Sequence, residues 1–159
     1  MEGGLTWYFA YGSNMNALRL FKERLKREGG AAGERIAGRL DAWRLAFNKR
    51  VRTPPGAGAG NIVAAPGEVV HGTLNFLPAK GLDVLDHYEG VVGGHYERRT
   101  VQVVRGDTGA TVDAVTYVAM LVGAELRPTR AYLAHLLAGR EYLSQDYWQA
   151  LAATLVHPD

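Results

Sequence analysis

An apolar run at residues 7–11 ends in a glycine turn, and a helical pattern follows directly. The run closes with the six residues from Phe9 to Asn14, whose sequence is Phe-Ala-Tyr-Gly-Ser-Asn. Leu18, Phe21 and Leu25 then recur at helical spacing, which predicts a helix over residues 16–28. A strand, a tight turn and a helix start leave several backbone N–H groups unpaired and pointing one way. Because such a cluster suits a carboxylate or a developing oxyanion, we expect an anion site at this turn.

Further strands are expected where apolar residues alternate or run together, over residues 43–47, 61–63, 69–77, 96–104 and 110–120. Helical patterns cover residues 79–89, 128–138 and 144–156, and a glycine- and proline-rich segment at 53–60 predicts a surface loop. Helices stand before, among and after about six strands without regular alternation, which indicates an α+β protein. We expect a small mixed β-barrel flanked by helices, because closure hides the sheet edges and provides a mouth for a ligand.

The length of 159 residues fits one domain spanning residues 1–159. A hydrophobic content of 47% and a charged content of 21% are typical of a soluble globular protein. The chain has no cysteine, which excludes disulfides, thiolate metal ligands and a cysteine nucleophile. It shows neither a signal-peptide pattern nor an apolar stretch of the roughly 20 residues that span a bilayer. We therefore expect a soluble, cytoplasmic protein without a membrane partner.

Positive charge is concentrated early in the chain. Eleven of the 18 lysines and arginines lie between Arg19 and Arg52, against four acidic residues in the same segment. A nucleic-acid surface would use such a cluster. The better interpretation is the solvated face of the first helix, formed by Lys22, Arg24 and their neighbours, with cations placed favourably near a helix C-terminus. No nucleic-acid partner is expected.

Most catalytic motifs can be eliminated. Ser13 lacks the flanking glycines of a nucleophile elbow, and Ser144 is placed as the N-cap of the last helix. The five histidines form no zinc motif, and the glycines of the 53–60 segment lack the lysine of a phosphate-binding loop. Metal chemistry and Ser-His hydrolysis are therefore disfavoured, which leaves the carboxylates.

Asp83, Asp86 and Glu89 follow one another at intervals of three along the helix predicted for residues 79–89. Glu89 precedes Gly90, where the helix can end and the chain can turn sharply. A carboxylate at that rigid end can project into a cavity and act as an acid/base if burial raises its pKa. The alternative is an ordinary solvated glutamate at a helix end.

The same motifs resemble the gamma-glutamylcyclotransferase family, including its AIG2-like branch. The resemblance lies in the segment ending Tyr-Gly-Ser-Asn, in Glu89-Gly90-Val91, and in the valine-rich strand that begins near Tyr96. The order and spacing of these motifs match, and the similarity extends over most of the chain, including Pro128 and Tyr132. The family fold is a small β-barrel flanked by helices. Members are often dimers, which makes a homodimer possible.

Carried onto this sequence, the resemblance implies a role for each motif. Glu89 takes the place of the family's catalytic glutamate. The substrate-binding positions are Tyr11, Gly12, Ser13, Asn14, Tyr96 and Tyr132. The implied reaction belongs to glutathione metabolism: the α-amine of a γ-glutamyl compound attacks its own γ-amide, which releases 5-oxoproline and a free amine. It needs neither cofactor nor metal, and its partner is the small γ-glutamyl substrate.

Two alternatives share this fold. One is an enzyme that removes a γ-glutamyl protecting group within a biosynthetic pathway. The other is a binding protein that keeps the pocket without turnover. The intact Glu89 argues against a pure binder, because binding alone has no need of an ionisable group at that point.

Overall fold

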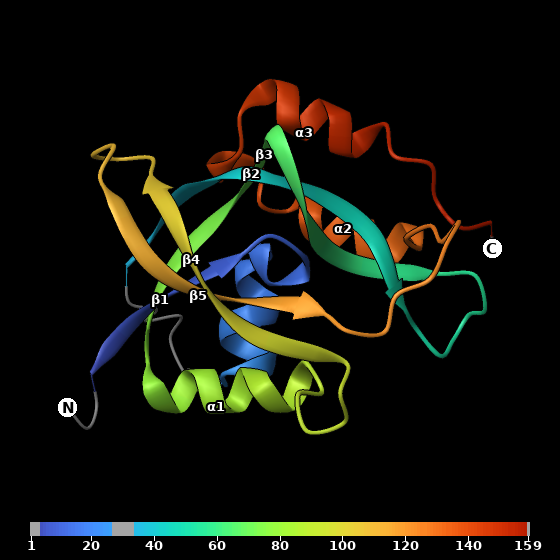
Figure 1. The fold of residues 1–159 in the computed structure, drawn as a ribbon, viewed down its shortest axis with the longest axis horizontal. Helices are drawn as coiled ribbons and strands as arrows, with labels where there is room; N and C mark the ends of the chain where they lie inside the picture. The colour runs from blue at the N-terminus through green and yellow to red at the C-terminus, as the bar shows by residue number, and fades with distance from the viewer. Residues whose placement is uncertain (1–3, 27–33, 159) are drawn as a thin grey trace.

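The computed structural model describes residues 4–26 and 34–158. The elements follow in the order β1 (Leu5–Ala10), η1 (Ser13–Met15), η2 (Leu18–Arg24), β2 (Arg35–Arg50), β3 (Gly58–Pro78), α1 (Ala79–Tyr88), β4 (Tyr96–Arg105), β5 (Thr111–Ala119), α2 (Arg130–Leu137), η4 (Arg140–Tyr142) and α3 (Gln145–Ala152) (Figure 1). The helix predicted for residues 16–28 is shorter than expected: a 3₁₀ turn precedes a π-helix, and residues 27–28 lie outside the described part.

The five strands close into a barrel in the order β1-β3-β2-β4-β5. β1 completes the ring by pairing parallel with β5, where Trp7 faces Ala114, and the other neighbours are antiparallel. The prediction of an α+β protein with a small mixed barrel is therefore confirmed. Two of the contacts in the ring are short: β1 pairs with β5 at Trp7 and Tyr8, and β2 pairs with β4 at Gly38 and Arg39.

Two predicted strands, 61–63 and 69–77, are one continuous strand, which makes five strands rather than six. Pro66 and Gly67, which separate the two predicted strands, lie at an irregularity where Asp41 pairs with Val69 and Trp43 pairs with Ala64. A bulge admits proline and extra residues while the strand continues. The predicted loop is also shorter than residues 53–60, because β3 begins at Gly58 and pairs there with Arg50.

Alternation along β1 divides the core into two clusters. Phe9 is fully buried in a cluster to which all five strands contribute, and this cluster fills the barrel. Tyr8 and Ala10, on the opposite face of the strand, pack in a second cluster with Met15 and Leu85 from the helical segments. Side chains that alternate between two apolar layers explain why β1 has an uninterrupted apolar sequence.

The helices cover the barrel from different sides, with α1 opposite α3 (Figure 1). α3 begins at Ser144, whose hydroxyl accepts a hydrogen bond from the Tyr147 N–H, as predicted for this N-cap. α1 follows β3 without a loop and ends beside the N-terminal segments. None of the helices in residues 4–26 and 34–158 is long and apolar enough to cross a membrane.

Candidate active site

A cavity of about 420 Å³ opens where the end of β1, the segment that follows it and the end of α1 meet the barrel. It brings together every residue that the sequence singled out for the site, from four separate parts of the chain. These residues are Tyr11, Gly12, Ser13, Asn14, Glu89, Tyr96 and Tyr132. The barrel and its helices therefore place the predicted turn and the predicted carboxylate in one concave surface.

The turn after β1 presents free backbone donors. Met15 N–H donates to the Gly12 carbonyl, so a helical turn begins at Ser13. At a helix start the first N–H groups have no acceptor in the preceding turn. Within the described part of the chain, the N–H groups of Ser13 and Asn14 have no protein acceptor. The geometry therefore agrees with the anion site expected from the sequence.

Gly12 is required by close packing rather than by a left-handed backbone. Its φ of −115° is accessible to any residue, so the turn does not need a left-handed backbone at this position. A Cβ on Gly12 would lie 3.1 Å from the Tyr132 hydroxyl oxygen, and one on Gly60 would lie 3.0 Å from the same atom. Both distances are tighter than ordinary contacts, so the two glycines allow Tyr132 to lie against the turn.

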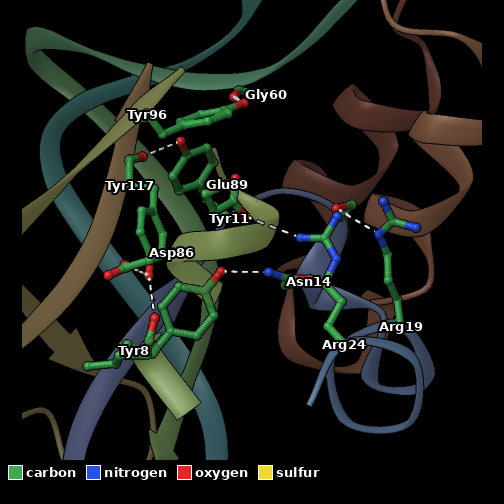
Figure 2. Close-up of polar contacts among 12 residues, drawn as sticks. Tyr8, Tyr11, Asn14, Arg19, Arg24, Gly60, Asp86, Glu89, Tyr96 and Tyr117 are labelled. Atoms are coloured by element: carbon green, nitrogen blue, oxygen red, sulfur yellow. Dashed lines mark hydrogen bonds and ion pairs between the residues drawn. The ribbon is translucent and has the colours of Figure 1, made fainter. Parts of the chain in front are cut away.

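Side chains hold the turn in place from three directions. Asn14 Nδ2 donates to the Tyr8 hydroxyl at 2.9 Å, and Arg19 Nε donates to Ser13 Oγ at 3.0 Å (Figure 2). Arg35, from β2, donates to the carbonyls of Asn14 and Met15. Sequence reasoning missed Arg35, because a cation in a strand pattern gives no signal that it points at a backbone turn.

Glu89 lies at the C-terminus of α1, where its N–H donates to the Leu85 carbonyl at 2.8 Å. Gly90 follows with φ of +65°, a left-handed conformation that favours glycine and lets the chain turn away. The Glu89 side chain is only 16% exposed and accepts an ion-paired hydrogen bond from Arg24 at 3.3 Å. Its carboxylate is thus fixed at the cavity wall by a helix end.

Two opposing effects act on the ionisation of Glu89. Burial raises the pKa of its carboxyl group, and Arg24, Arg19 and Lys49 partly counteract that rise through their positive charges. A carboxylate with a raised pKa both accepts and returns a proton nearer neutral pH than a solvated one. The arrangement can therefore support acid–base chemistry by a single residue.

The other two acidic residues of α1 form ion pairs outside the cavity. Asp83 and Asp86 pair with Arg98 at 3.1 and 2.7 Å, and Asp86 also accepts from the Tyr117 hydroxyl (Figure 2). Neither aspartate lines the cavity. Of the three evenly spaced carboxylates, only Glu89 reaches it.

Three tyrosines of the cavity are hydrogen-bonded to the backbone. The Tyr96 hydroxyl donates to the Gly60 carbonyl at 2.7 Å, and the Tyr132 hydroxyl accepts from the Gly60 N–H at 2.9 Å. The Tyr11 hydroxyl donates to the Tyr117 carbonyl. Burial raises the pKa of Tyr132 to about 12 and holds that of Tyr11 well above its usual value, so both phenols are neutral. These rings shape the cavity.

Three cations in the cavity lining were not predicted as site residues: Arg19, Arg24 and Lys49. The expectation that Arg24 belongs to a solvated helix face is wrong, since its side chain is 13% exposed and its guanidinium lies 5.2 Å from the centre of the Tyr88 ring. The short η2 turns Arg24 toward the cavity, while Lys22 on the same segment remains exposed. Which cation of a helix is buried depends on what packs against it.

Solved structures with the same fold include two described as cyclotransferases. One, described as gamma-glutamyl cyclotransferase, has a TM-score of 0.84 and 24% identity, covering 96% of this chain and 89% of that protein. A yeast gamma-glutamyl cyclotransferase specific to glutathione has a TM-score of 0.61 and 13% identity, with coverages of 93% and 94%. A human protein described as uncharacterized protein loc79017 has a TM-score of 0.83 and 25% identity, with coverages of 96% and 89%. No curated protein sequence matches the chain significantly.

The barrel and its flanking helices are thus the gamma-glutamylcyclotransferase fold. The sequence profile of the AIG2-like family matches residues 69–151, more than half of the chain. The chain belongs to the AIG2-like family. The matched segment contains Glu89, Tyr96 and Tyr132, whereas the Tyr-Gly-Ser-Asn turn precedes it.

Proposed function

We propose that this protein is a γ-glutamyl cyclotransferase that acts on a γ-glutamyl amino acid or amine. The observation that carries the proposal is the single cavity in which the buried carboxylate of Glu89 lies with the unpaired N–H groups of Ser13 and Asn14. The Glu89 carboxylate would bind the α-amine of a γ-glutamyl compound, and the two N–H groups would bind its α-carboxylate. The fold shared with proteins described as gamma-glutamyl cyclotransferases supports the same assignment.

In the proposed reaction the substrate supplies its own nucleophile. The α-nitrogen forms a bond to the γ-carbonyl carbon, and the bond from that carbon to the amide nitrogen breaks. A five-membered ring, 5-oxoproline, forms and the amine leaves. Holding the substrate in the folded geometry accounts for much of the acceleration, because an intramolecular attack avoids the entropy cost of bringing two molecules together.

Glu89 would move the proton that this reaction requires. An α-ammonium, with a reference pKa near 8, must lose a proton before it can attack. The Glu89 carboxylate accepts that proton and returns it to the departing nitrogen, serving first as base and then as acid. The α-nitrogen loses a second proton as the lactam N–H forms, and this proton leaves with the amine, which departs as its ammonium. The ammonium would take over the position against Glu89 that the Arg24 guanidinium holds at 3.3 Å.

The turn after β1 would bind the α-carboxylate. The N–H groups of Ser13 and Asn14 point from a helix start, where the backbone dipoles favour negative charge. Arg19, held at 3.0 Å from Ser13 Oγ, adds a positive charge close by. Tyr96 and Tyr132 would enclose the glutamyl half.

The direct test is to incubate the purified protein with a panel of γ-glutamyl dipeptides and γ-glutamyl amines and to measure 5-oxoproline. Formation of 5-oxoproline together with the free amine would support the proposal, and the preferred members of the panel would indicate the leaving group. A single narrow activity on a modified γ-glutamyl compound would favour the pathway-specific deprotecting enzyme. Binding without product across the panel would refute the cyclotransferase and favour a binding protein.

A further inference from the structure

Lys49 is a buried cation in the cavity without an acidic partner. It lies near the end of β2, and the residue is only 5% exposed. None of the ion pairs formed by residues 4–26 and 34–158 includes it. Its ammonium donates one hydrogen bond, to the Arg50 carbonyl, and lies 5.7 Å from the centre of the Tyr96 ring. Two of its three donors therefore have no protein acceptor in the described chain.

A buried ammonium group without a counter-ion is energetically unfavourable, and a bound anion would stabilise it. Lysine is almost never fully buried unless it is paired, because removing an ammonium group from water is costly. Burial accordingly lowers the pKa of Lys49, and the charge of Glu89 only partly opposes that effect. A bound carboxylate would restore the missing interaction.

The other two cations of the cavity already have contacts. Arg24 pairs with Glu89, and Arg19 donates to Ser13 beside the turn with the free N–H groups. Both come from η2, whereas Lys49 comes from β2, where it pairs with Ala59 of β3. The cavity thus has two cationic regions from different elements, η2 and β2. The η2 region already contacts the turn after β1 through Arg19.

We propose that Lys49 binds a second carboxylate of the substrate, the one carried by the departing amino acid. This inference rests on the proposed function, which assigns the first carboxylate to the turn and the α-amine to Glu89. Lys49 would then make the protein favour γ-glutamyl amino acids and peptides, whose leaving half bears a carboxylate near the scissile amide, over γ-glutamyl amines. It is a specificity residue and takes no part in proton transfer.

The test compares γ-glutamylalanine with γ-glutamylethylamide, which differ only in the carboxylate of the leaving half. Binding is measured by calorimetry to the Glu89→Gln variant, in which turnover is blocked, with and without Lys49→Met. Loss of a charge-assisted contact should weaken γ-glutamylalanine binding by about 10- to 100-fold. Binding of the ethylamide should change by less than about twofold. Lys49→Arg, which keeps the charge, should retain most of the preference for γ-glutamylalanine.

Arg50→Met is the matched control, because Arg50 is the exposed neighbour of Lys49 on the same strand and does not line the cavity. It should leave the binding of both compounds unchanged. Equal weakening of both compounds by Lys49→Met would overturn the inference, since it would indicate general disruption of the cavity. Failure of γ-glutamylalanine to bind the Glu89→Gln protein would also overturn it.

Turnover by the protein with an intact Glu89 separates this inference from the proposed function. If Lys49→Met selectively weakens the binding of γ-glutamylalanine but the unmodified protein forms no 5-oxoproline, the role of Lys49 is supported and the proposed cyclotransferase activity is refuted. If 5-oxoproline forms while Lys49→Met weakens the binding of both compounds alike, the proposed cyclotransferase activity is supported and the role of Lys49 is refuted.

Discussion

At the scale of single residues, Glu89 is placed between two opposing influences. Its side chain is removed from most of the solvent, which favours the protonated acid, while Arg24 at 3.3 Å favours the carboxylate. A solvated glutamate would have neither influence. This balance lets one group take up and release a proton during a single reaction.

Glu89→Gln should abolish nearly all turnover while preserving substrate binding. The change is almost isosteric and removes the ionisable carboxyl group, so kcat should fall by about 10²- to 10⁴-fold. Steady-state rates of 5-oxoproline formation and calorimetric binding would measure both effects. The matched control is Asp86→Asn on the same helix, which should retain turnover. A Glu89→Gln variant with more than a third of the original kcat would exclude Glu89 as the acid/base.

The same variant should be more stable than the original protein near pH 8. Because the pKa of Glu89 is higher in the folded than in the unfolded chain, the folded state holds its proton more tightly. As pH rises from the unfolded pKa through the folded pKa, the glutamate protein loses stability, whereas the glutamine protein does not. Urea unfolding should therefore give equal free energies of unfolding near pH 3 and a higher one for Glu89→Gln near pH 8. The reverse order near pH 8 would mean that the Arg24 ion pair outweighs burial.

Arg24→Gln should move the acidic limb of the kcat/KM profile to higher pH. The guanidinium lowers the pKa of Glu89, so its removal leaves burial unopposed and raises that pKa. The base form of Glu89 then appears only at higher pH. A pH–rate profile measures the shift, with Lys22→Gln, an exposed cation on the same segment, as the control. An unmoved limb in Arg24→Gln would show that another group controls it.

At the scale of elements, the turn after β1 depends on β2. Arg35 donates to the carbonyls of Asn14 and Met15 and, at 2.8 Å, to Asn75 Oδ1 on β3. Its guanidinium also lies 5.2 Å from the centre of the Tyr142 ring. One arginine therefore joins the turn, the barrel and η4, and so holds the turn in place from outside the cavity lining.

Arg35→Met should weaken both the fold and substrate binding. Three oxygens lose a donor, and leaving buried acceptors unpaired should lower the free energy of unfolding by about 2–4 kcal/mol. Because the turn loosens, KM should rise more than kcat falls. Denaturant unfolding and steady-state kinetics test the two parts. Arg39→Met, at an exposed position of the same strand, should change the free energy of unfolding by less than about 0.5 kcal/mol. Unchanged KM in Arg35→Met would contradict the positioning role.

Gly12→Ala should be damaging because of Tyr132. The added methyl group would lie 3.1 Å from the Tyr132 hydroxyl oxygen, and overpacking of this kind costs about 1–3 kcal/mol. Combining it with Tyr132→Phe should restore much of the loss, because neighbouring substitutions are not additive. Ser13→Ala should be milder, since it loses only the hydrogen bond from Arg19, worth about 0.5–1.5 kcal/mol. Stability and binding are compared across Gly12→Ala, Tyr132→Phe, their combination and Ser13→Ala, and strictly additive effects of the first two would exclude the proposed clash.

At the scale of the whole molecule, the cavity exists only because the barrel closes. The turn after β1, the end of α1, the start of β3 and α2 are far apart in the sequence, yet each contributes to one surface. A small molecule bound there would be contacted from several parts of the chain at once. The homodimer allowed by the family resemblance stays a prediction, which the molar mass in solution would test.

The complete cavity should require both a free α-amine and a free α-carboxylate on the glutamyl group. An N-acetylated substrate should be inert, because its nitrogen can no longer attack. An α-amide analogue should bind about 1.5–3 kcal/mol more weakly, since it loses a charge-assisted hydrogen bond at the turn. Product analysis and calorimetry measure these effects, with the unmodified γ-glutamyl compound as reference. Release of amine from the N-acetyl compound would indicate hydrolysis instead of ring closure.

Much of this architecture could be predicted from local patterns. The alternation of strand residues, the N-cap at Ser144 and the helix end before Gly90 depend on neighbours in the sequence, so these features were predicted. The position of Glu89 at a helix end was predictable for the same reason. The bounds of β2 were not, because the strand predicted for residues 43–47 runs from Arg35 to Arg50. The continuation of β3 through Pro66 could not be predicted, because the bulge that accommodates the proline depends on pairing with β2.

The sequence by itself therefore determined the types of element, the fold class and the motifs of the site. Only the tertiary structure decided which charges are buried. Lys49 and Arg50 are adjacent cations on one strand, yet one is 5% exposed in the cavity and the other is exposed to solvent. Alternation shows that they face opposite sides but not which side becomes the cavity. That depends on the helices and strands that close over it, and burial by those elements changes the ionisation of Glu89 and Lys49.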